Sequence, residues 1–334
     1  MKVLVTGAAG LLGSHVAELA LRRGDAVRLF VRPGEDVSWL DKTGAEVCRG
    51  DLKDLASLEA AVKGVDLVIH CAARMGPWGP EAEYQLVNVR GPRALAETAL
   101  AAGVQRIVHV SSIDVHGLVV GEGVDETGPY GSEEDLYCRT KTAGEVEVQR
   151  LIKDKGAPVT VVRPGLIYGP RDTHSFGRFV RLVEQGKMVI IGAGKNHLPL
   201  IYVTDVAQGI LLASEANKAI GRTYLLVNDE PVTQADYFNA IARELGVRPP
   251  KWHVPYRLAL VLGATGELVG HLTRSEKPPP IMRFGLKQIG GENRFVIARA
   301  RQELGFSPQV NLAEGVRQGV AWYRARRPEQ STAQ

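Results

Sequence analysis

Short apolar runs alternate with longer amphipathic stretches through the first half of the chain. The runs are rich in Val, Leu and Ile, which is typical of strands buried on both faces, and the stretches repeat apolar positions at helical spacing. This alternation predicts an α/β fold in which a doubly wound parallel sheet carries helices on both faces. The expected strands lie at 3–5, 26–31, 46–49, 65–69, 106–110 and 159–162, and the expected helices at 11–23, 83–102 and 136–154.

The alternation weakens after residue 170, so we expect a first domain over residues 1–170 and a smaller mixed C-terminal lobe over 171–330, with some of the chain returning to the sheet. The apolar stretch 255–272 carries only Arg257 and Glu267 as charges, which we expect to face water. It is interpreted as a lid or lobe helix, and the alternative is a helix lying on a membrane surface. The other expected elements are helices at 176–185, 205–214, 234–245, 298–304 and 312–323, and strands at 188–191 and 224–227.

A glycine-rich turn joins the first strand to the first helix. In Thr6-Gly7-Ala8-Ala9-Gly10-Leu11-Leu12-Gly13, Gly7 would permit the tight turn and Gly10 a close approach of the backbone to a pyrophosphate. Gly13 would let the helix pack against the strand, and the N–H groups at Leu11 and Leu12 would bind the anion. The pattern predicts a Rossmann-type dinucleotide site in residues 1–170, which leaves the lobe to bind substrate.

The end of the second strand bears on the choice of dinucleotide. NAD enzymes usually carry Asp or Glu there to bind the ribose 2′-OH, whereas this chain has Val31 followed by Arg32. A guanidinium suits a 2′-phosphate, so NADP(H) is favoured and NAD(H) is the alternative. Asp51, after the third strand, is expected to accept from the adenine amino group or to cap a helix. Small residues after the fourth strand, Ala72 and Ala73, leave room for a cofactor.

Tyr137 and Lys141 are four residues apart in an expected helix, which places the phenol and the ammonium on one face. A lysine cation close to a phenol favours the phenolate, so we expect Lys141 to lower the pKa of Tyr137 from roughly 10 toward neutral pH. Ser112 follows the fifth strand and can meet this pair across the ligand edge of a parallel sheet. The three residues are the candidate catalytic set.

Composition excludes several classes of partner. Hydrophobic residues make up 45% and charged residues 23% of the 334 residues, and a net charge of +4 is too small to indicate nucleic acid. Three cysteines without metal-ligand spacing indicate no metal site and a reducing compartment. The N-terminus is interpreted as a strand rather than a signal peptide, and no uncharged apolar run reaches the roughly 18 residues of a spanning helix. We therefore expect a cytoplasmic protein.

Taken together, the motifs resemble the extended short-chain dehydrogenase/reductase superfamily over nearly the whole chain. The resemblance implies a nicotinamide cofactor on a Rossmann sheet, and it adds Leu52, Asn88 and Pro164 to the residues expected to hold that cofactor. Its carriers are Thr6-Gly7-x-x-Gly10-x-x-Gly13, Asp51-Leu52, His70-Cys71-Ala72-Ala73, Asn88-Val89, Ser111-Ser112, Tyr137-x-x-x-Lys141, Arg163-Pro164, Tyr168-Gly169-Pro170 and Tyr202-Val203-x-Asp205-Val206-Ala207.

Within the superfamily the chain is similar to the 3β-hydroxysteroid dehydrogenase branch, which includes sterol-4-carboxylate 3-dehydrogenases and 2-alkyl-3-oxoalkanoate reductases. The residues Val31-Arg32-Pro33 are also similar to dihydroflavonol-reductase-like proteins. The branch implies reversible hydride transfer between nicotinamide and a secondary alcohol or ketone, with Ser112 and Tyr137 bonding the oxygen and Lys141 the ribose. The branch similarity is carried by Gly76-Pro77-Trp78-Gly79, Glu276-Lys277-Pro278-Pro279-Pro280, Arg294-Phe295, Ala300-Arg301 and Leu304-Gly305-Phe306-Ser307-Pro308.

Departures from nucleotide-sugar enzymes indicate the substrate. Sugar-nucleotide epimerases resembling this chain usually have Asn in place of Leu166 and Arg in place of Leu198, and leucines cannot donate to a diphosphate. Met75 and Trp78 add apolar area near the expected site. We therefore expect an apolar 3-hydroxy or 3-oxo substrate such as a sterol, a steroid or a 3-oxoalkanoate.

Two other functions stay open at this point. One is a nucleotide-sugar epimerase or dehydratase that uses the same Ser/Tyr/Lys set, and the other is a non-catalytic dinucleotide-binding regulator. A homodimer and weak contact with a membrane surface are further expectations about partners.

Overall fold

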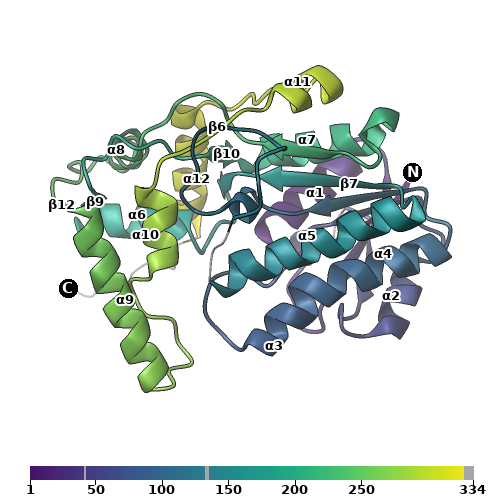
Figure 1. Cartoon of the computed structure of the whole chain (residues 1–334). Coiled ribbons are helices and arrows are strands. Elements are labelled where there is room, and N and C mark those ends of the chain that lie inside the picture. Colours follow the sequence, from purple (N-terminus) through teal and green to yellow (C-terminus); the bar gives the residue numbers. More distant parts are fainter. Residues whose placement is uncertain (41–42, 132–134, 327–334) are drawn as a thin grey trace, which may run out of the picture.

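A single parallel sheet of seven strands organises the chain (Figure 1). The computed structural model describes residues 1–40, 43–131 and 135–326. The strand order is β11-β7-β5-β4-β1-β2-β3, and neighbouring strands pair in parallel throughout. This confirms the predicted Rossmann-type, doubly wound sheet. Its strands are β1 (Lys2–Thr6), β2 (Ala26–Val31), β3 (Glu46–Arg49), β4 (Leu67–His70), β5 (Arg106–Val110), β7 (Val159–Pro164) and β11 (Thr223–Leu226).

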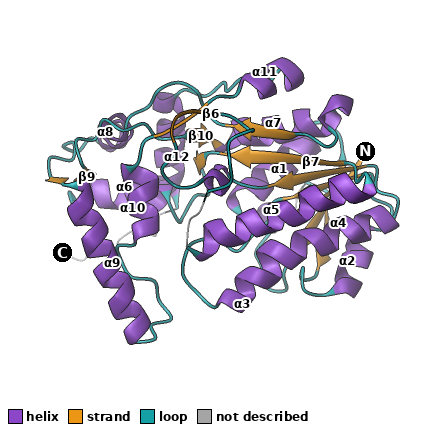
Figure 2. Ribbon diagram, viewed as in Figure 1, coloured by secondary structure: helices purple, strands orange, loops and turns teal. Residues whose placement is uncertain are grey.

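Helices cover both faces of this sheet (Figures 1 and 2). On one face α2 (Leu55–Val62), α4 (Gly91–Ala101) and α5 (Leu136–Lys155) enclose one apolar core, and on the other α1 (Leu11–Arg22) and α7 (Val203–Glu215) enclose a second. The strands between the two cores are apolar on both sides, which is why they appear in the sequence as continuous runs rather than alternating ones.

The remaining chain forms a smaller lobe with an aromatic core. Tyr168, Phe176, Tyr202, Tyr237 and Phe238 are buried together in it. Three short parallel strand pairs belong to the region around it: β8 (Leu166–Tyr168) with β10 (Leu200–Tyr202), β9 (Ile190–Ile191) with β12 (His253–Val254), and β6 (Gly121–Val124) with β13 (Asn293–Phe295). The helices of this part are α6 (Phe176–Glu184), α8 (Gln234–Leu245), α9 (Tyr256–Leu272), α10 (Arg283–Gly290) and α12 (Leu312–Ala325).

Segments from the second half do return to the sheet. Strand β11 pairs with β7, helix α7 packs beside α1, and α11 (Ala298–Leu304) packs beside β11. The described chain after residue 170 is therefore not a body separate from the sheet. Of the expected lobe, residues 327–330 lie outside the described residues.

A few local elements differ from the expectation. The helix expected at 83–102 is built from α3 (Glu81–Tyr84), a π-helical segment (Gln85–Arg90) and α4. The strand expected at 188–191 is limited to β9, because only Ile190 and Ile191 pair with β12. Helices α2 and α10 were not predicted. The N-cap of α2 is Asp54, whose side chain accepts from the Ala56 N–H, so Asp51 does not cap this helix.

Helix α9 matches the expected helix at 255–272, but one of its charges is placed differently. Arg257 is exposed, whereas Glu267 is half-buried and binds the Nε of Arg283 on α10 at 2.7 Å. Among the residues that the structure describes, no helix is long and apolar enough to cross a membrane.

Candidate active site

The glycine turn lies where β1 meets α1, at the carboxyl edge of the sheet. Gly7 has a φ of +65°, and a Cβ there would lie 2.8 Å from the backbone of Ala72, after β4. A Cβ at Gly13 would lie 2.3 Å from the Gly7 carbonyl oxygen, so only glycine lets the helix start approach the strand this closely. The N–H of Gly10 donates to the Gly7 oxygen at 2.9 Å and closes the turn. This cradle fits a dinucleotide pyrophosphate, with the N–H groups of α1 as its anion donors.

Arg32 stands directly after β2, as predicted, but it already has a partner. Its guanidinium binds the carboxylate of Glu35 at 2.7 and 2.9 Å while its side chain remains 68% exposed. Arg49, at the end of β3, donates to the carbonyl oxygens of both residues at 3.3 Å. The site thus holds two cations and one carboxylate. The sequence prediction missed Glu35, although its spacing of three residues from Arg32 was a usable signal.

The remaining residues expected to hold the cofactor lie along the same edge. Asp51 is half-buried, and one of its carboxylate oxygens accepts from the N–H of Lys53 at 3.0 Å. Leu52 is buried and belongs to the core beneath α4. The N–H of Ala72 donates to Thr6 at 3.2 Å, which ties the loop after β4 to the glycine turn. Ala73 follows it, and Pro164 ends β7 on the other side of the site.

Asn88 is buried in the π-helical segment, and its amide is fully engaged. Its oxygen accepts from the N–H of Arg74 at 2.7 Å, and its nitrogen donates to the Arg74 oxygen at 3.0 Å and to Thr140 at 3.2 Å. These bonds hold the loop after β4 against α5. Asn88 therefore positions this loop, and its expected contact with the cofactor stays a prediction.

Ser112, Tyr137 and Lys141 come together between β5 and the first turns of α5. Asp135 begins this helix as its N-cap, accepting from the Cys138 N–H at 2.9 Å. All three side chains are buried, and the Lys141 ammonium donates to the carbonyl oxygen of Val110, the last residue of β5, at 2.9 Å. The spacing of Tyr137 and Lys141 and the position of Ser112 after β5 bring the three predicted residues to one place.

The expected lowering of the Tyr137 pKa by Lys141 is wrong for this arrangement. Burial raises the pKa of Tyr137 above its usual value, the nearby carboxylate of Asp114 raises it further, and the hydrogen bond with Ser112 opposes this shift. The Lys141 ammonium is instead committed to the backbone of β5, and burial lowers its pKa to about 8 against the opposing charge of Glu145. At neutral pH the phenol therefore holds its proton and is suited to act as an acid.

A buried ion pair between Glu145 and Arg163 lies next to the three candidate catalytic residues. Glu145 lies one turn beyond Lys141 on α5, is fully buried, and binds the Nε of Arg163 on β7 at 3.1 and 3.2 Å. Its carboxylate also accepts from Ser111 at 2.5 Å and from Tyr130 at 3.0 Å. The pair thus joins α5, β5 and β7 around the catalytic residues. Its signal in the sequence was the repeat of Tyr137, Lys141 and Glu145 at four-residue spacing.

His116 contacts the same buried ion pair through Arg163. Its Nε2 lies 2.8 Å from Nη1 of Arg163, and its Nδ1 lies 3.0 Å from the Pro129 carbonyl oxygen. Because arginine can only donate, we assign the neutral tautomer in which Nδ1 carries the proton. Burial and the charge of Arg163 lower the pKa of His116, in agreement with this assignment.

The lobe reaches the catalytic residues through α10. The ring of Phe284 packs edge-on against Tyr137 with 5.9 Å between centroids, so only 5% of Tyr137 is exposed. Phe284 lies far along the chain from Tyr137, and no local motif in the sequence indicated its position. It is the residue of the lobe that we place closest to the reacting group.

The residues expected to contact substrate have different environments. Met75 is exposed, and Leu166 is half-buried on β8. Trp78 packs on His271 of α9 with 4.4 Å between centroids and donates to the Ser275 oxygen at 3.0 Å, so it joins its loop to the end of α9. Leu198 is buried in the aromatic core of the lobe, and its expected contact with substrate stays a prediction.

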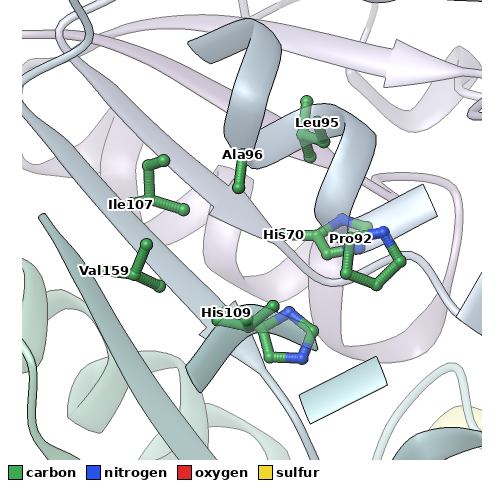
Figure 3. Close-up of a pocket in the computed structure, with 8 residues that line it drawn as sticks. His70, Pro92, Leu95, Ala96, Ile107, His109 and Val159 are labelled. Carbon is green, nitrogen blue, oxygen red and sulfur yellow. The ribbon is translucent and has the colours of Figure 1, made fainter. Parts of the chain in front are cut away.

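A small internal cavity lies under the sheet edge, between β4, β5 and α4 (Figure 3). It is lined by His70 and His109, whose rings stack at 5.5 Å, and by apolar side chains. At about 10 Å³ it has room for no more than a single water, so it is not a substrate site. Burial lowers the pKa of His70 to about 3, so this ring is neutral.

One group of metal-type ligands occurs in the described residues, away from the cysteines. Glu122, His197 and Glu292 place ligand atoms within 4.8 Å of one another. Glu292 binds His197 at 2.7 Å, and Glu122 lies 3.4 Å from Arg294. Each of these three side chains therefore already has a partner within the protein.

The sheet, the glycine turn and the Ser/Tyr/Lys set define an α/β protein of Rossmann type. The chain belongs to the NAD dependent epimerase/dehydratase family, whose model matches residues 3–226. This confirms the predicted superfamily. It also supports a nicotinamide dinucleotide as the cofactor, without deciding between NAD(H) and NADP(H).

Three relatives cover almost the whole chain. The 2-alkyl-3-oxoalkanoate reductase of Stenotrophomonas maltophilia is 32% identical over 95% of this chain and 98% of its own length. The decarboxylating sterol-4-alpha-carboxylate 3-dehydrogenase of Mus musculus is 31% identical over 96% of this chain and 90% of its own. The crystal structure of gox2253 is 33% identical, covers 97% of this chain and 98% of that chain, and superposes with a TM-score of 0.82.

Proposed function

We propose that the chain interconverts a ketone and a secondary alcohol on an apolar 3-oxo or 3-hydroxy substrate, using NADP(H). The class of activity, an NAD(P)-dependent oxidoreductase acting on CH–OH groups, is confirmed by relatives named as reductases and dehydrogenases. The observation that carries the proposal for this chain is the meeting of Ser112, Tyr137 and Lys141 beside the glycine turn. In the proposed division of labour, residues 1–170 hold the cofactor and 171–330 the substrate.

Each catalytic side chain has a role that follows from its environment. In reduction, the Ser112 and Tyr137 hydroxyls bond the carbonyl oxygen, and Tyr137, protonated at neutral pH, donates the proton. As the resemblance implies, Lys141 would bond the nicotinamide ribose, and its ammonium is held in place by the Val110 carbonyl oxygen. The nicotinamide supplies or accepts the hydride when bound. Phe284 and Leu166 offer apolar surface to the substrate on the lobe side.

The preference for NADP(H) rests on Arg32 and Arg49. Two guanidiniums at the ends of β2 and β3 suit a 2′-phosphate, because charge-assisted bonds to phosphate are strong and arginine presents paired donors. Glu35 opposes this preference, since its carboxylate would have to release Arg32 and would repel the phosphate. If Glu35 keeps Arg32, the same carboxylate can accept from a ribose hydroxyl, and NAD(H) is the alternative.

The apolar substrate is supported by the names of the relatives and by the lobe. Both named relatives act at a position numbered 3 of an oxoalkanoate or a sterol carboxylate. In this chain Leu198 is packed in the lobe core and offers no polar group, and the Leu166 side chain cannot donate to a diphosphate. A nucleotide-sugar epimerase remains the second candidate, because the matching family includes that chemistry.

The test is a spectrophotometric screen of the purified protein with NADPH and NADH against 3-oxo acids, 3-oxosteroids and UDP-glucose. Tyr137→Phe should lower kcat by at least about a hundredfold, the usual scale for losing an acid catalyst. Tyr224→Phe is the matched control, because Tyr224 lies on the far strand β11 and its hydroxyl donates to Glu303 on α11. Near-parental turnover by Tyr137→Phe would refute the mechanism, and robust interconversion of UDP-glucose and UDP-galactose would favour the epimerase.

A further inference from the structure

Helix α9 exposes a continuous apolar face. Six of its Leu and Val side chains are between 50 and 75% exposed, and spacings of three, four and seven residues place them on one side of the helix. A monomeric protein rarely leaves such a contiguous patch uncovered without a binding function. The exposed side chains are Leu258, Val261, Leu262, Leu268, Val269 and Leu272.

The opposite side of α9 is built for close packing. Ala259, Gly263 and Gly270 are buried, and a Cβ at Gly263 would lie 3.1 Å from the backbone of Arg283 at the start of α10. A Cβ at Gly270 would lie 2.9 Å from the ring of Trp78. Figure 1 shows α9 at the outer edge of the lobe, with α10 between it and the body of the protein. The helix is therefore held firmly on its inner side and is open on its outer side.

The positive charge of the segment around α9 favours an anionic partner. Residues 251–287 contain six Lys and Arg and two Glu, a net charge of +4, which equals the formal net charge of the whole chain. The rest of the chain is thus neutral overall, and the excess positive charge of the protein lies in the segment that contains α9 and α10. Trp252, which is 74% exposed, precedes the helix, and tryptophan is typical of the boundary between lipid and water.

We propose that the exposed face of α9 binds the surface of an anionic phospholipid membrane, with the helix lying in the plane of the lipid headgroups. Apolar side chains would enter the headgroup boundary while Lys251, Arg257, Arg274 and Lys277 contact lipid phosphates. A helix of 17 residues with charged flanks suits this orientation better than a spanning one. A second copy of the chain is the weaker occupant, because a two-fold axis would bring two identical cationic segments together.

The membrane contact would place the active site next to its substrate. Helix α9 packs on α10, and α10 carries Phe284 onto the ring of Tyr137. An apolar substrate dissolved in the lipid would then reach Tyr137 by displacement of one aromatic side chain, without crossing water. This consequence rests on the proposed function, whereas the lipid contact itself does not.

Co-sedimentation of the full-length protein with vesicles tests the proposal. We expect binding to phosphatidylcholine vesicles that contain phosphatidylglycerol, and much weaker binding to phosphatidylcholine alone or at high salt. The double variant Val261→Glu/Leu272→Glu should lower the partition coefficient at least about tenfold, because it buries two carboxylates at the lipid boundary. Leu55→Glu on α2, another exposed leucine, is the matched control and should bind like the parent.

Three results would overturn the proposal: no binding to any vesicle, binding unaffected by the double variant, or binding independent of anionic lipid. Light scattering tests the other occupant, since conversion of a parental dimer into a monomer by the double variant would assign the face to a second copy. Reduction of a water-soluble ketone keeps the test separate from the proposed function. The double variant should retain the parental rate on that ketone whether or not the protein binds lipid.

Discussion

Replacing Glu145 with Gln tests the ion pair beneath the catalytic residues most directly. The substitution keeps the shape of the side chain and removes its charge. The Arg163 guanidinium, which is 5% exposed, then loses the carboxylate that its Nε contacts at 3.1 and 3.2 Å. His116 and the Glu126 carbonyl oxygen remain as acceptors for Nη1, but neither carries a negative charge at neutral pH.

The expected cost is large compared with total stability. Breaking a buried pair by removing one partner typically costs about 3–5 kcal/mol, because the remaining charge is left uncompensated. Folded domains have only about 5–15 kcal/mol of total stability. Since two neutral acceptors remain, we expect Glu145→Gln to lower the free energy of unfolding by about 3 kcal/mol.

The assay is urea unfolding, in which the parent and the variants are fitted with one common slope of unfolding free energy against urea concentration. The double variant Glu145→Gln/Arg163→Met removes both charges and should recover most of the loss, because a buried pair replaced by neutral groups is often nearly neutral in stability. A loss under about 1 kcal/mol in the single variant, or a double variant no more stable than the single one, would refute this account.

The same variant should alter the dependence of stability on acid. Burial alone would raise the pKa of Glu145, but the bonds from Arg163, Ser111 and Tyr130 outweigh it and hold the pKa below the ordinary 4.5. A carboxyl whose pKa is lowered by folding contributes stability above its unfolded pKa, and this stability is lost as pH falls through the folded value. The parent should therefore lose stability below about pH 4.5 more steeply than Glu145→Gln, as measured by melting across pH 3–6.

Two further predictions concern the cofactor and the rate. Arg32→Ala should weaken NADPH binding much more than NADH binding in calorimetric titration, because only NADPH carries the 2′-phosphate; equal weakening would show that Arg32 does not set the preference. If the Lys141 ammonium supports proton transfer, kcat for reduction should fall as pH rises through about 8, where burial has placed its pKa. Lys141→Arg stays charged over that range, so the same fall in this variant would assign the titration to another group.

The sequence by itself determined the sheet and most of its helices. Helix α8 (Gln234–Leu245) and strand β5 (Arg106–Val110) have the predicted bounds, since the apolar repeat and the capping box at Thr233 are local features. The glycine turn was also readable, because the backbone of Gly7 and the approach at Gly13 exclude any other residue. In a parallel sheet the carboxyl ends of the strands and the N-termini of the helices that follow them lie at one edge. Ser112, after β5, and the Tyr137/Lys141 pair, in the first turns of α5, could therefore be brought together without coordinates.

Only the tertiary structure decided the electrostatics at the carboxyl edge of the sheet and which side chains of the lobe cover this edge. The pKa of Tyr137 depends on how deeply Phe284 buries the phenol and on Asp114, and Lys141 is bound by the backbone of β5. The carboxylate of Glu35 forms an ion pair with the guanidinium of Arg32. This ion pair weakens the argument for NADP(H) that rested on Arg32 in the sequence alone. Such effects depend on desolvation and on distances between groups remote in sequence, and neither quantity is encoded in local spacing. Most helices of the lobe were predicted as elements, but their arrangement was not, because they take their positions from packing against one another rather than from a repeating βα pattern.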